Sequence, residues 1–544
     1  MLLTTQAGAG NRVTPDGAAE SDGVEHREVT MATGTMPMRQ TSDAAPPLVG
    51  GKAALAEGAW MGAAQATDVL EPLHLARRRR QPSTGWLPRR RVAGLLTREC
   101  TVAEATVILM ASFFLSALLG AVRQVLFNAQ FGAGAEANAY YAAFRLPDAL
   151  FSLIAGGALS SAMIPVLLNT AQETGNAAAA RLINRILTTV GAGVVVIVLA
   201  SEVCTPLFVT HVLAPGFDAA TRQLTINLTR VMLLQPLILV VGSVATAVLN
   251  SRKQFLLTGL AVVSHNVALI AGIIAARAAP RLGIYGPTLG VVGGAVLQVL
   301  ILLPGLLAAG LRLRPEWQPS DRRLREVVRL LIPNGLAVGV AYSGFILDTA
   351  FASQATQEAG LAALHNAWLL VGLPIALLGQ AVGQSAFPRL AEQAASGVWT
   401  VLRRTVVQAL GAVVGLSLPA LLGLILLGRP VIHLLFEHGK YDAAAGAVTY
   451  AVLVPYALGL PAYVATEVLT RGLIALRDTR TPLVTNSLQL LGRAVLILLL
   501  LSSMGVAAIP TAFAVPAVGE AVGLGFMLWR TIRRLPQARV SPIA

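Results

Sequence analysis

Long apolar stretches follow one another from residue 103 almost to the end of the chain, and short polar segments separate them. A stretch of about 20 apolar residues crosses the hydrocarbon core of a bilayer as a helix. The spacing predicts twelve spans, at 103–127, 139–168, 184–213, 223–250, 255–276, 284–311, 327–353, 361–388, 405–428, 447–470, 481–502 and 507–529. We therefore expect an all-α integral membrane protein with about twelve transmembrane helices.

The charge distribution supports this expectation. Charged residues make up 12% of the chain and the net charge is +14, whereas soluble domains carry roughly 25% charged residues. Lys and Arg number 16 in the loops expected to be cytoplasmic and 5 in the opposite loops. Positive residues collect on the cytoplasmic side of membrane proteins. The basic balance thus predicts a multi-pass protein with both termini in the cytoplasm, and it does not indicate a nucleic-acid partner.

Residues 1–102 differ from the rest of the chain. They are rich in Ala, Gly, Thr and Pro, and they lack the large apolar residues that a core requires. No apolar h-region of a signal peptide follows the first residues. Arginines at 77–80 and 89–91 place this segment near anionic lipid headgroups on the cytoplasmic side. We expect a disordered cytoplasmic tail, or a start codon assigned too early, and a short cytoplasmic tail at 533–544.

An internal repeat divides the spans into two sets. GGALSSAMIPVL at 156–167 aligns with GQAVGQSAFPRL at 379–390, and GFDAA at 216–220 aligns with KYDAA at 440–444. The nearly constant offset indicates a duplication. It predicts two six-helix lobes, at 103–318 and 319–532. Because each lobe has an even number of spans, a pseudo-twofold axis along the membrane normal should relate them.

Several ionisable residues lie inside the predicted spans, where inserting an unpaired charge into the hydrocarbon costs about 3 kcal/mol or more of free energy. Arg123, Arg145 and Arg230 cluster in the first half, and guanidinium groups bind phosphate oxygens bidentately. They predict a wet, cationic cavity for an anionic substrate such as a diphosphate. The alternative is that Arg123 reaches an interface or pairs with Asp148.

The second half carries Asp348, Glu467 and Arg493 inside its spans, which indicates internal pairing or a cation site. No GxxxxGK, HExxH or DxD pattern occurs, and the loops are too short for a catalytic domain. Cys100 and Cys204 indicate neither a disulfide framework nor a metal site. We therefore expect a transporter that is not an enzyme, without a metal or other cofactor.

Several motifs together resemble the bacterial lipid II flippase family, MurJ or MviN, over about 103–530. They are LLGAVRQ, FGAGAEANAYYAAFRLPDAL, GGALSSAMIPVL, LAPGFDAATRQLT, PLILVVGSVATAVLNSRKQF, LLGQAVGQSAFPRLAEQAASG, LFEHGKYDAAA and ALRDTRTPL. The resemblance implies the two-lobed fold of the multidrug exporter superfamily and alternating access by rocking of the lobes. It implies that a polyprenyl-diphosphate-linked cell-wall precursor, lipid II first of all, crosses the inner membrane.

The resemblance also implies roles for individual residues. Arg123 stands where the family has an arginine that is important for the diphosphate, and Arg145 fills a usual Lys or Arg position. Asn138 replaces a usual Asp and joins them as a substrate-binding candidate. The family's other basic positions hold Ala117, Phe151–Ser152 and Leu369 in this chain. Family members generally have two further helices after the twelve predicted here.

These departures keep other functions open. The substrate could be another lipid-linked saccharide, or a small amphipathic cation exported by sodium or proton antiport. A non-transporting scaffold that binds cell-wall synthesis proteins is the second alternative. Transport could couple to the membrane potential, Na⁺ or H⁺. Arg493 would pair with Asp348 in place of a sodium ion, or Asp348 would bind an ion or a proton while Arg493 lines the cavity.

Overall fold

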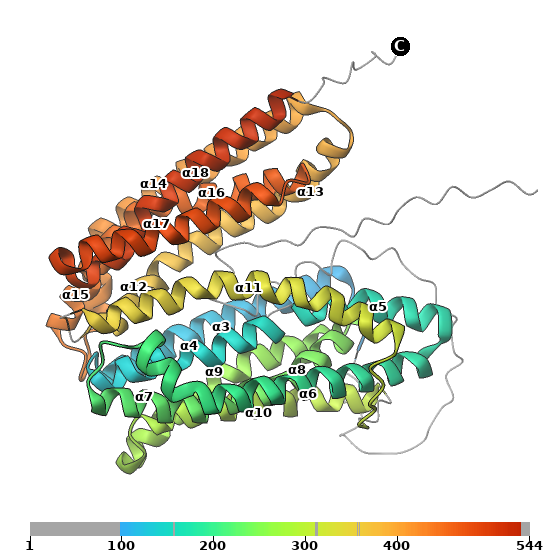
Figure 1. Ribbon diagram of the computed structural model, residues 1–544, viewed down its shortest axis with the longest axis horizontal. Coiled ribbons are helices and arrows are strands. Elements are labelled where there is room, and N and C mark those ends of the chain that lie inside the picture. The colour runs from blue at the N-terminus through green and yellow to red at the C-terminus, as the bar shows by residue number, and fades with distance from the viewer. Residues whose placement is uncertain (1–97, 156–157, 310–313, 356, 358, 535–544) are drawn as a thin grey trace, which may run out of the picture. The chain divides into compact units, whose positions relative to one another are not determined.

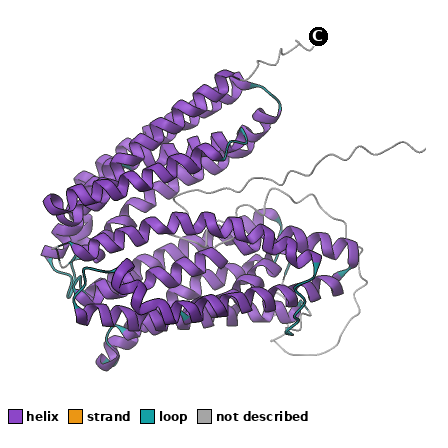
Figure 2. Cartoon of the chain, viewed as in Figure 1, coloured by secondary structure: helices purple, strands orange, loops and turns teal. Residues whose placement is uncertain are grey.

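The computed structural model describes residues 98–155, 158–309, 314–355, 357 and 359–534, and all regular secondary structure in these ranges is helical (Figure 2). The chain divides into two units, Met1–Pro46 and Pro47–Ala544. The first unit and most of both predicted tails lie outside the described residues. Every described helix therefore belongs to the second unit.

The first half of the described chain consists of eight α-helices and two short helical segments (Figure 1). They are α3 (Val102–Phe131), α4 (Ala135–Ala155), α5 (Ala158–Thr174), α6 (Asn176–Phe208), the π-helical η2 (Val209–Leu213), α7 (Ala219–Met232), α8 (Leu234–Ser251), α9 (Phe255–Ala278), the 3-10 segment η3 (Pro280–Leu282) and α10 (Tyr285–Ala308).

The second half continues with helices of similar lengths. They are α11 (Arg322–Gln354), α12 (Gly360–Pro374), the π-helical η4 (Ile375–Gln380), α13 (Ala381–Ala395), α14 (Trp399–Leu435), α15 (Ala443–Leu458), α16 (Leu460–Ala475), α17 (Arg480–Met504), the 3-10 segment η5 (Gly505–Ala507) and α18 (Ala508–Arg534).

Local chemistry fixes where several helices begin. Thr101 and Glu104 form a capping box at the start of α3, in which side-chain oxygens accept hydrogen bonds from free backbone N–H groups. Asp218 caps α7 in the same way, and Asp442 caps α15. The two aspartates lie 224 positions apart, and so do Lys253 and Arg477, the two non-glycine residues with positive φ in the described ranges. Helix caps and turns thus recur at the offset of the sequence repeat.

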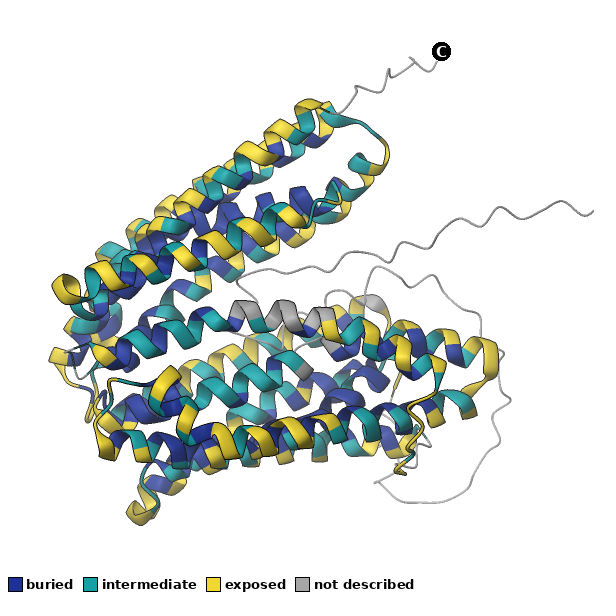
Figure 3. Ribbon diagram, viewed as in Figure 1, coloured by how far each residue is buried: buried dark blue, intermediate teal, exposed yellow. Residues whose placement is uncertain are grey.

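The helices are long and apolar enough for several membrane crossings. Within the described residues, eight helices pass this test by length and composition, and nine if the bent pair α15–α16 counts as one span. One of the eight joins α17 and α18. Large apolar side chains such as Leu426, Leu498 and Val522 stay exposed, and Figure 3 shows exposed stretches along α14, α17 and α18. Such surfaces require an apolar surrounding, which the bilayer supplies.

The observed helices differ from the predicted spans in two respects. The predicted second span, 139–168, corresponds to α4 and α5, and neither these helices nor α11 pass the span test. Polar and charged residues within α4 and α11, among them Arg145, Asp148 and Asp348, lower their mean hydropathy. Helices such as α14 also extend several residues beyond the predicted apolar run, because helix formation continues into polar flanks.

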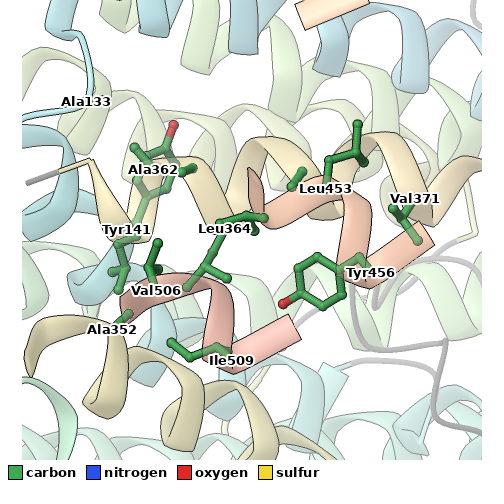
Figure 4. Packing of buried hydrophobic residues seen from close by; sticks show 14 of the residues in the cluster. Ala133, Tyr141, Ala352, Ala362, Leu364, Val371, Leu453, Tyr456, Val506 and Ile509 are labelled. Carbon is green, nitrogen blue, oxygen red and sulfur yellow. The ribbon is translucent and has the colours of Figure 1, made fainter. Parts of the chain in front are cut away.

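Buried apolar residues form three main clusters. The largest draws on helices from both halves, including Tyr141, Leu364, Tyr456 and Ile509, which Figure 4 shows together. A second cluster lies among α5, α6, α8 and the start of α11, and a third among α13, α14, α16 and α18. Helix α11 therefore packs mainly against α4 and α5 of the first half. The predicted lobe boundaries remain a prediction.

Candidate cationic site

Arg123 lies on α3 and is held by a fixed partner on α9. Its Nη1 donates to Oδ1 of Asn266 at 3.1 Å. Nδ2 of Asn266 in turn donates to Oγ of Ser116 at 2.9 Å and to the Ser116 carbonyl at 3.1 Å, which orients the amide oxygen toward the guanidinium. Among the described residues Arg123 does not pair with Asp148, so the pairing part of that alternative is wrong, and contact with an interface stays a prediction. The side chain is half-buried and makes no ion pair among the described residues.

Arg145, Asp148 and Ser152 lie on one face of α4, opposite α11, since residues three and seven positions apart share a helix face. Nε of Arg145 donates to Oγ1 of Thr349 at 3.1 Å, and its guanidinium carbon lies 5.4 Å from the ring centre of Phe345. The Tyr342 hydroxyl donates to Asp148, and the Ser152 hydroxyl donates to Tyr342 at 3.3 Å. The acid is thus engaged by a tyrosine, and the arginine stays without an ion pair in the described part of the chain.

Arg493 and Asp348 contact each other across α17 and α11. The Nη2 group of Arg493 donates to Oδ2 of Asp348, and both side chains are buried. The guanidinium lies over Phe513 of α18, 4.4 Å from the ring centre. A buried arginine and aspartate neutralise each other, and the aromatic face adds a cation–π contact. This ion pair therefore adds no net charge to the site that contains Arg123 and Arg145.

Glu467 is not a member of that pair. It binds Arg471 one turn along α16, with 2.9 Å between Oε2 and Nη1, and both residues are buried. The sequence grouped Glu467 with Asp348 and Arg493 because all three lie in apolar runs. Glu467 instead contacts Arg471, because side chains four positions apart are neighbours on one face of a helix.

The two other predicted substrate residues have partners of their own. Arg230, at the end of α7, is exposed and faces Glu202, with 3.7 Å between Nε and Oε2. Asn138 is buried at the start of α4, and its Oδ1 accepts a hydrogen bond from the backbone N–H of Ala362 at 3.2 Å. That N–H belongs to the first turn of α12, where backbone donors lack helical partners. Arg230 is thus paired with an acid, and Asn138 caps a helix.

A buried polar network joins the two halves beside the cations. Nε2 of Gln124 on α3 donates to the Tyr141 hydroxyl at 2.6 Å and to Oδ1 of Asn366 on α12 at 2.7 Å. Nδ2 of Asn366 donates to the Tyr441 hydroxyl at 3.0 Å. Buried amides and hydroxyls stay in an apolar interior only when such bonds are made. The network therefore fixes α3, α4 and α12 against one another.

Sequence reasoning did not identify Asn266, Thr349, Tyr342 or Gln124. These are ordinary polar residues in apolar runs, and their partners lie on other helices more than 140 positions away for the first two. Only the packing of the helices brings Asn266 to Arg123 and Thr349 to Arg145. Tyr342 instead contacts Asp148, and Gln124 contacts Tyr141 and Asn366. His365 on α12 stacks on Tyr141 with ring centres 4.5 Å apart.

The arrangement is suited to binding an anion. Arg123 and Arg145 are half-buried and have hydrogen bonds to neutral groups only, so their charges are not cancelled by a contacting carboxylate in the described residues. Each guanidinium has five N–H donors, and one neutral contact leaves donors for a ligand. Phosphate oxygens match this geometry.

Known proteins with similar sequences belong to one named family. Residues 127–542 match the family model described as lipid II flippase MurJ. A probable lipid II flippase MurJ from Rhizobium tropici is 29% identical over 423 residues, which is 76% of this chain and 78% of that protein. The lipid II flippase MurJ of Burkholderia cenocepacia is 29% identical over 374 residues, covering 68% of this chain and 72% of that protein.

Solved structures with similar folds include two kinds of transporter. A lipid II flippase MurJ in an inward closed conformation has a TM-score of 0.68 and 20% identity, covering 78% of this chain and 87% of that chain. An inward-facing multidrug transporter of the MATE family has a TM-score of 0.65 and 14% identity, covering 79% and 98%. The family match spans most of the chain, and the chain belongs to the lipid II flippase MurJ family of membrane transporters.

Proposed function

We propose that this protein moves lipid II, the polyprenyl-diphosphate-linked cell-wall precursor, across the bacterial inner membrane. The observation that carries the proposal is the pair of half-buried arginines, Arg123 and Arg145, which have only neutral hydrogen-bond partners in the described residues. The diphosphate is the most anionic part of such a lipid and matches two guanidinium groups. The named flippases to which the chain is similar support the same substrate.

The transport mechanism we propose is alternating access between two six-helix lobes related by an axis along the membrane normal. The correspondence of helices, including caps at Asp218 and Asp442, supports the duplication. The excess of Lys and Arg in one set of loops supports cytoplasmic termini. The polar network of Gln124 and Asn366 would hold one end of the cavity closed while the other is open.

Rescue of a bacterium depleted of its own lipid II flippase tests the substrate. We expect growth from the unmodified chain, and lipid II flipping by the purified protein in vesicles. Rescue of growth together with flipping would support the proposal. Resistance to cationic drugs without rescue would overturn it in favour of a drug exporter. Neither activity, together with retained binding to cell-wall synthesis proteins, would favour a scaffold.

We further propose that transport does not require sodium, because Arg493 supplies a tethered positive charge to Asp348. The guanidinium occupies the carboxylate and stacks on Phe513, which makes a separate cation at this carboxylate unnecessary. Flipping in proteoliposomes should proceed equally in sodium and potassium buffers. A sodium requirement in the unmodified protein would overturn this proposal, and Asp348 would then hold an ion or a proton while Arg493 lines the cavity.

A further inference from the structure

His365 lies on α12 at the boundary between the two halves. Its imidazole stacks on the phenol ring of Tyr141 on α4, with ring centres 4.5 Å apart and an angle of 25° between the ring planes. The histidine is half-buried. In the part of the chain that the structure describes, its ring nitrogens have neither a hydrogen bond nor an ion pair. A polar ring in an apolar span therefore keeps hydrogen-bonding capacity for another molecule.

The position of this ring is fixed by its neighbours. The Tyr141 hydroxyl accepts a hydrogen bond from Gln124, and Gln124 also binds Asn366, the residue next to His365. Tyr141 packs against Phe127 as well, with ring centres 5.3 Å apart. Stacking on an anchored phenol sets the plane of the imidazole, so the plane in which its ring nitrogens can bond a ligand is defined in advance.

The residues that hold this ring adjoin both arginines along their helices. Arg145 lies one helical turn from Tyr141 on α4, and Arg123 directly precedes Gln124, which bonds the Tyr141 hydroxyl. These two guanidinium groups come from α4 and α3, whereas His365 comes from α12. A ring that carries an N–H donor therefore stacks on the residue next to which the α4 arginine is placed.

We propose that His365 is a third phosphate-binding residue, which donates a hydrogen bond to an oxygen of the diphosphate held by Arg123 and Arg145. The inference rests on the proposed function and adds a contact from the opposite half of the molecule. This contact exists only while α12 lies against α4, so it strengthens binding in the conformation described here. A ligand shifts a conformational equilibrium only through such a difference in affinity.

Binding of undecaprenyl diphosphate and undecaprenyl monophosphate to the full chain in nanodiscs tests the inference. A hydrogen bond to a charged group is worth roughly a tenfold or greater change in affinity. His365→Ala should weaken diphosphate binding by about tenfold or more and change monophosphate binding less, because the smaller headgroup cannot reach all three residues. His365→Gln, which keeps an N–H donor, should recover part of the loss.

His211→Ala is the matched control, since His211 is exposed and bonds the carbonyl of Leu207 in its own helix. It should bind both lipids like the unmodified chain. Unchanged diphosphate binding by His365→Ala, in a protein whose unmodified form binds the diphosphate, would overturn the inference alone. So would equal losses for both lipids in the Ala and Gln variants. An unmodified chain that binds neither lipid would instead overturn the proposed function.

Discussion

At the scale of single residues, the described part of this protein separates cations that are neutralised from cations that are not. Arg493 and Arg471 each contact a buried carboxylate on Asp348 or Glu467. Arg123 and Arg145 bind only neutral oxygens of Asn266 and Thr349. A guanidinium away from water is costly unless it has a partner of opposite charge. An anionic ligand therefore gains the most binding free energy at Arg123 and Arg145.

Arg123→Ala should abolish flipping in proteoliposomes while leaving the amount of protein in the membrane unchanged. The guanidinium bonds only the Asn266 amide, so its loss removes little packing. Arg123→Lys should restore a part, because a point charge keeps attraction but loses the bidentate geometry. Arg281→Ala, at an exposed position of the 3-10 segment η3, is the control and should flip normally. Full activity of Arg123→Ala would contradict the assigned role.

The pair of Asp348 and Arg493 should behave as one energetic unit. Asp348→Asn and Arg493→Leu should each destabilise the protein by about 3 kcal/mol or more, because each leaves a buried partner uncompensated. The double variant should lose clearly less than the two losses combined. Thermal unfolding in one detergent measures this cycle. The exposed pair Arg98–Glu104 is the control, and its cycle should show little coupling because water screens both charges. Additive losses would show that the two buried charges are independent.

At the scale of elements, the π-helical segment η4 and helix α13 lie directly over the buried ion pair of α16. A Cβ added at Gly383 would come within 2.1 Å of Nη1 of Arg471, and one at Gly379 within 3.3 Å of Cγ of Glu467. The two glycines therefore permit the close approach of this segment to the ion pair. The π-helical segment that follows Pro374 changes the helix periodicity, so Gly379 and Gly383 both face α16.

Gly383→Ala should therefore destabilise the protein by about 1–3 kcal/mol, as expected for overpacking at a site that cannot yield freely. Arg471 can move away only by weakening its buried bond to Glu467. Gly411→Ala, with open space around it on α14, should be neutral or slightly stabilising, since alanine favours helix. The measurement is the midpoint of thermal unfolding of the Gly383→Ala and Gly411→Ala variants. Equal midpoints would show that Arg471 moves away from the added methyl group without loss of stability.

At the scale of the whole second unit, one contact joins the last turn of α3 to the tight turn before α15. The backbone N–H of Lys440 donates to the Ala129 carbonyl at 2.8 Å. Gly439 has φ +61°, and an added Cβ would lie 2.2 Å from that carbonyl oxygen. With the network of Gln124 and Asn366, this contact links the end of α3 to the second half of the chain.

Gly439→Ala should open this contact. The loss should exceed the roughly 1–2 kcal/mol of left-handed strain alone, because the backbone clash adds to it. Hydrogen–deuterium exchange should rise in residues 436–449, and lipid binding in the closed conformation should weaken. Gly175→Ala, at φ +85° with open space around the added Cβ, is the control for a substitution at positive φ without a backbone clash. Identical exchange in residues 436–449 of the two variants would exclude a gating role for the contact.

Deletion of residues 1–95 should leave membrane insertion and flipping near normal. This segment contains no apolar stretch long enough to span and few residues that could build a core. Basic residues just before α3, including Arg98, are retained because they help to set orientation. Growth rescue and flipping by the shortened protein provide the measurement. An inactive or misinserted product would show that the segment takes part in folding or transport.

The sequence by itself predicted that the chain is helical and that it crosses a membrane several times, and both are confirmed in the described residues. Hydrocarbon leaves no water for backbone groups, so long apolar runs become helices whatever their neighbours, and Asp218 and Asp442 cap them by local bonds. It also predicted which charged residues lie within apolar stretches. Tertiary structure alone decided which of these charges are neutralised. Arg493 meets Asp348 across 145 positions and Arg123 meets Asn266 across 143. Such contacts depend on the rotation and crossing of packed helices, and local hydrophobic periodicity does not specify either.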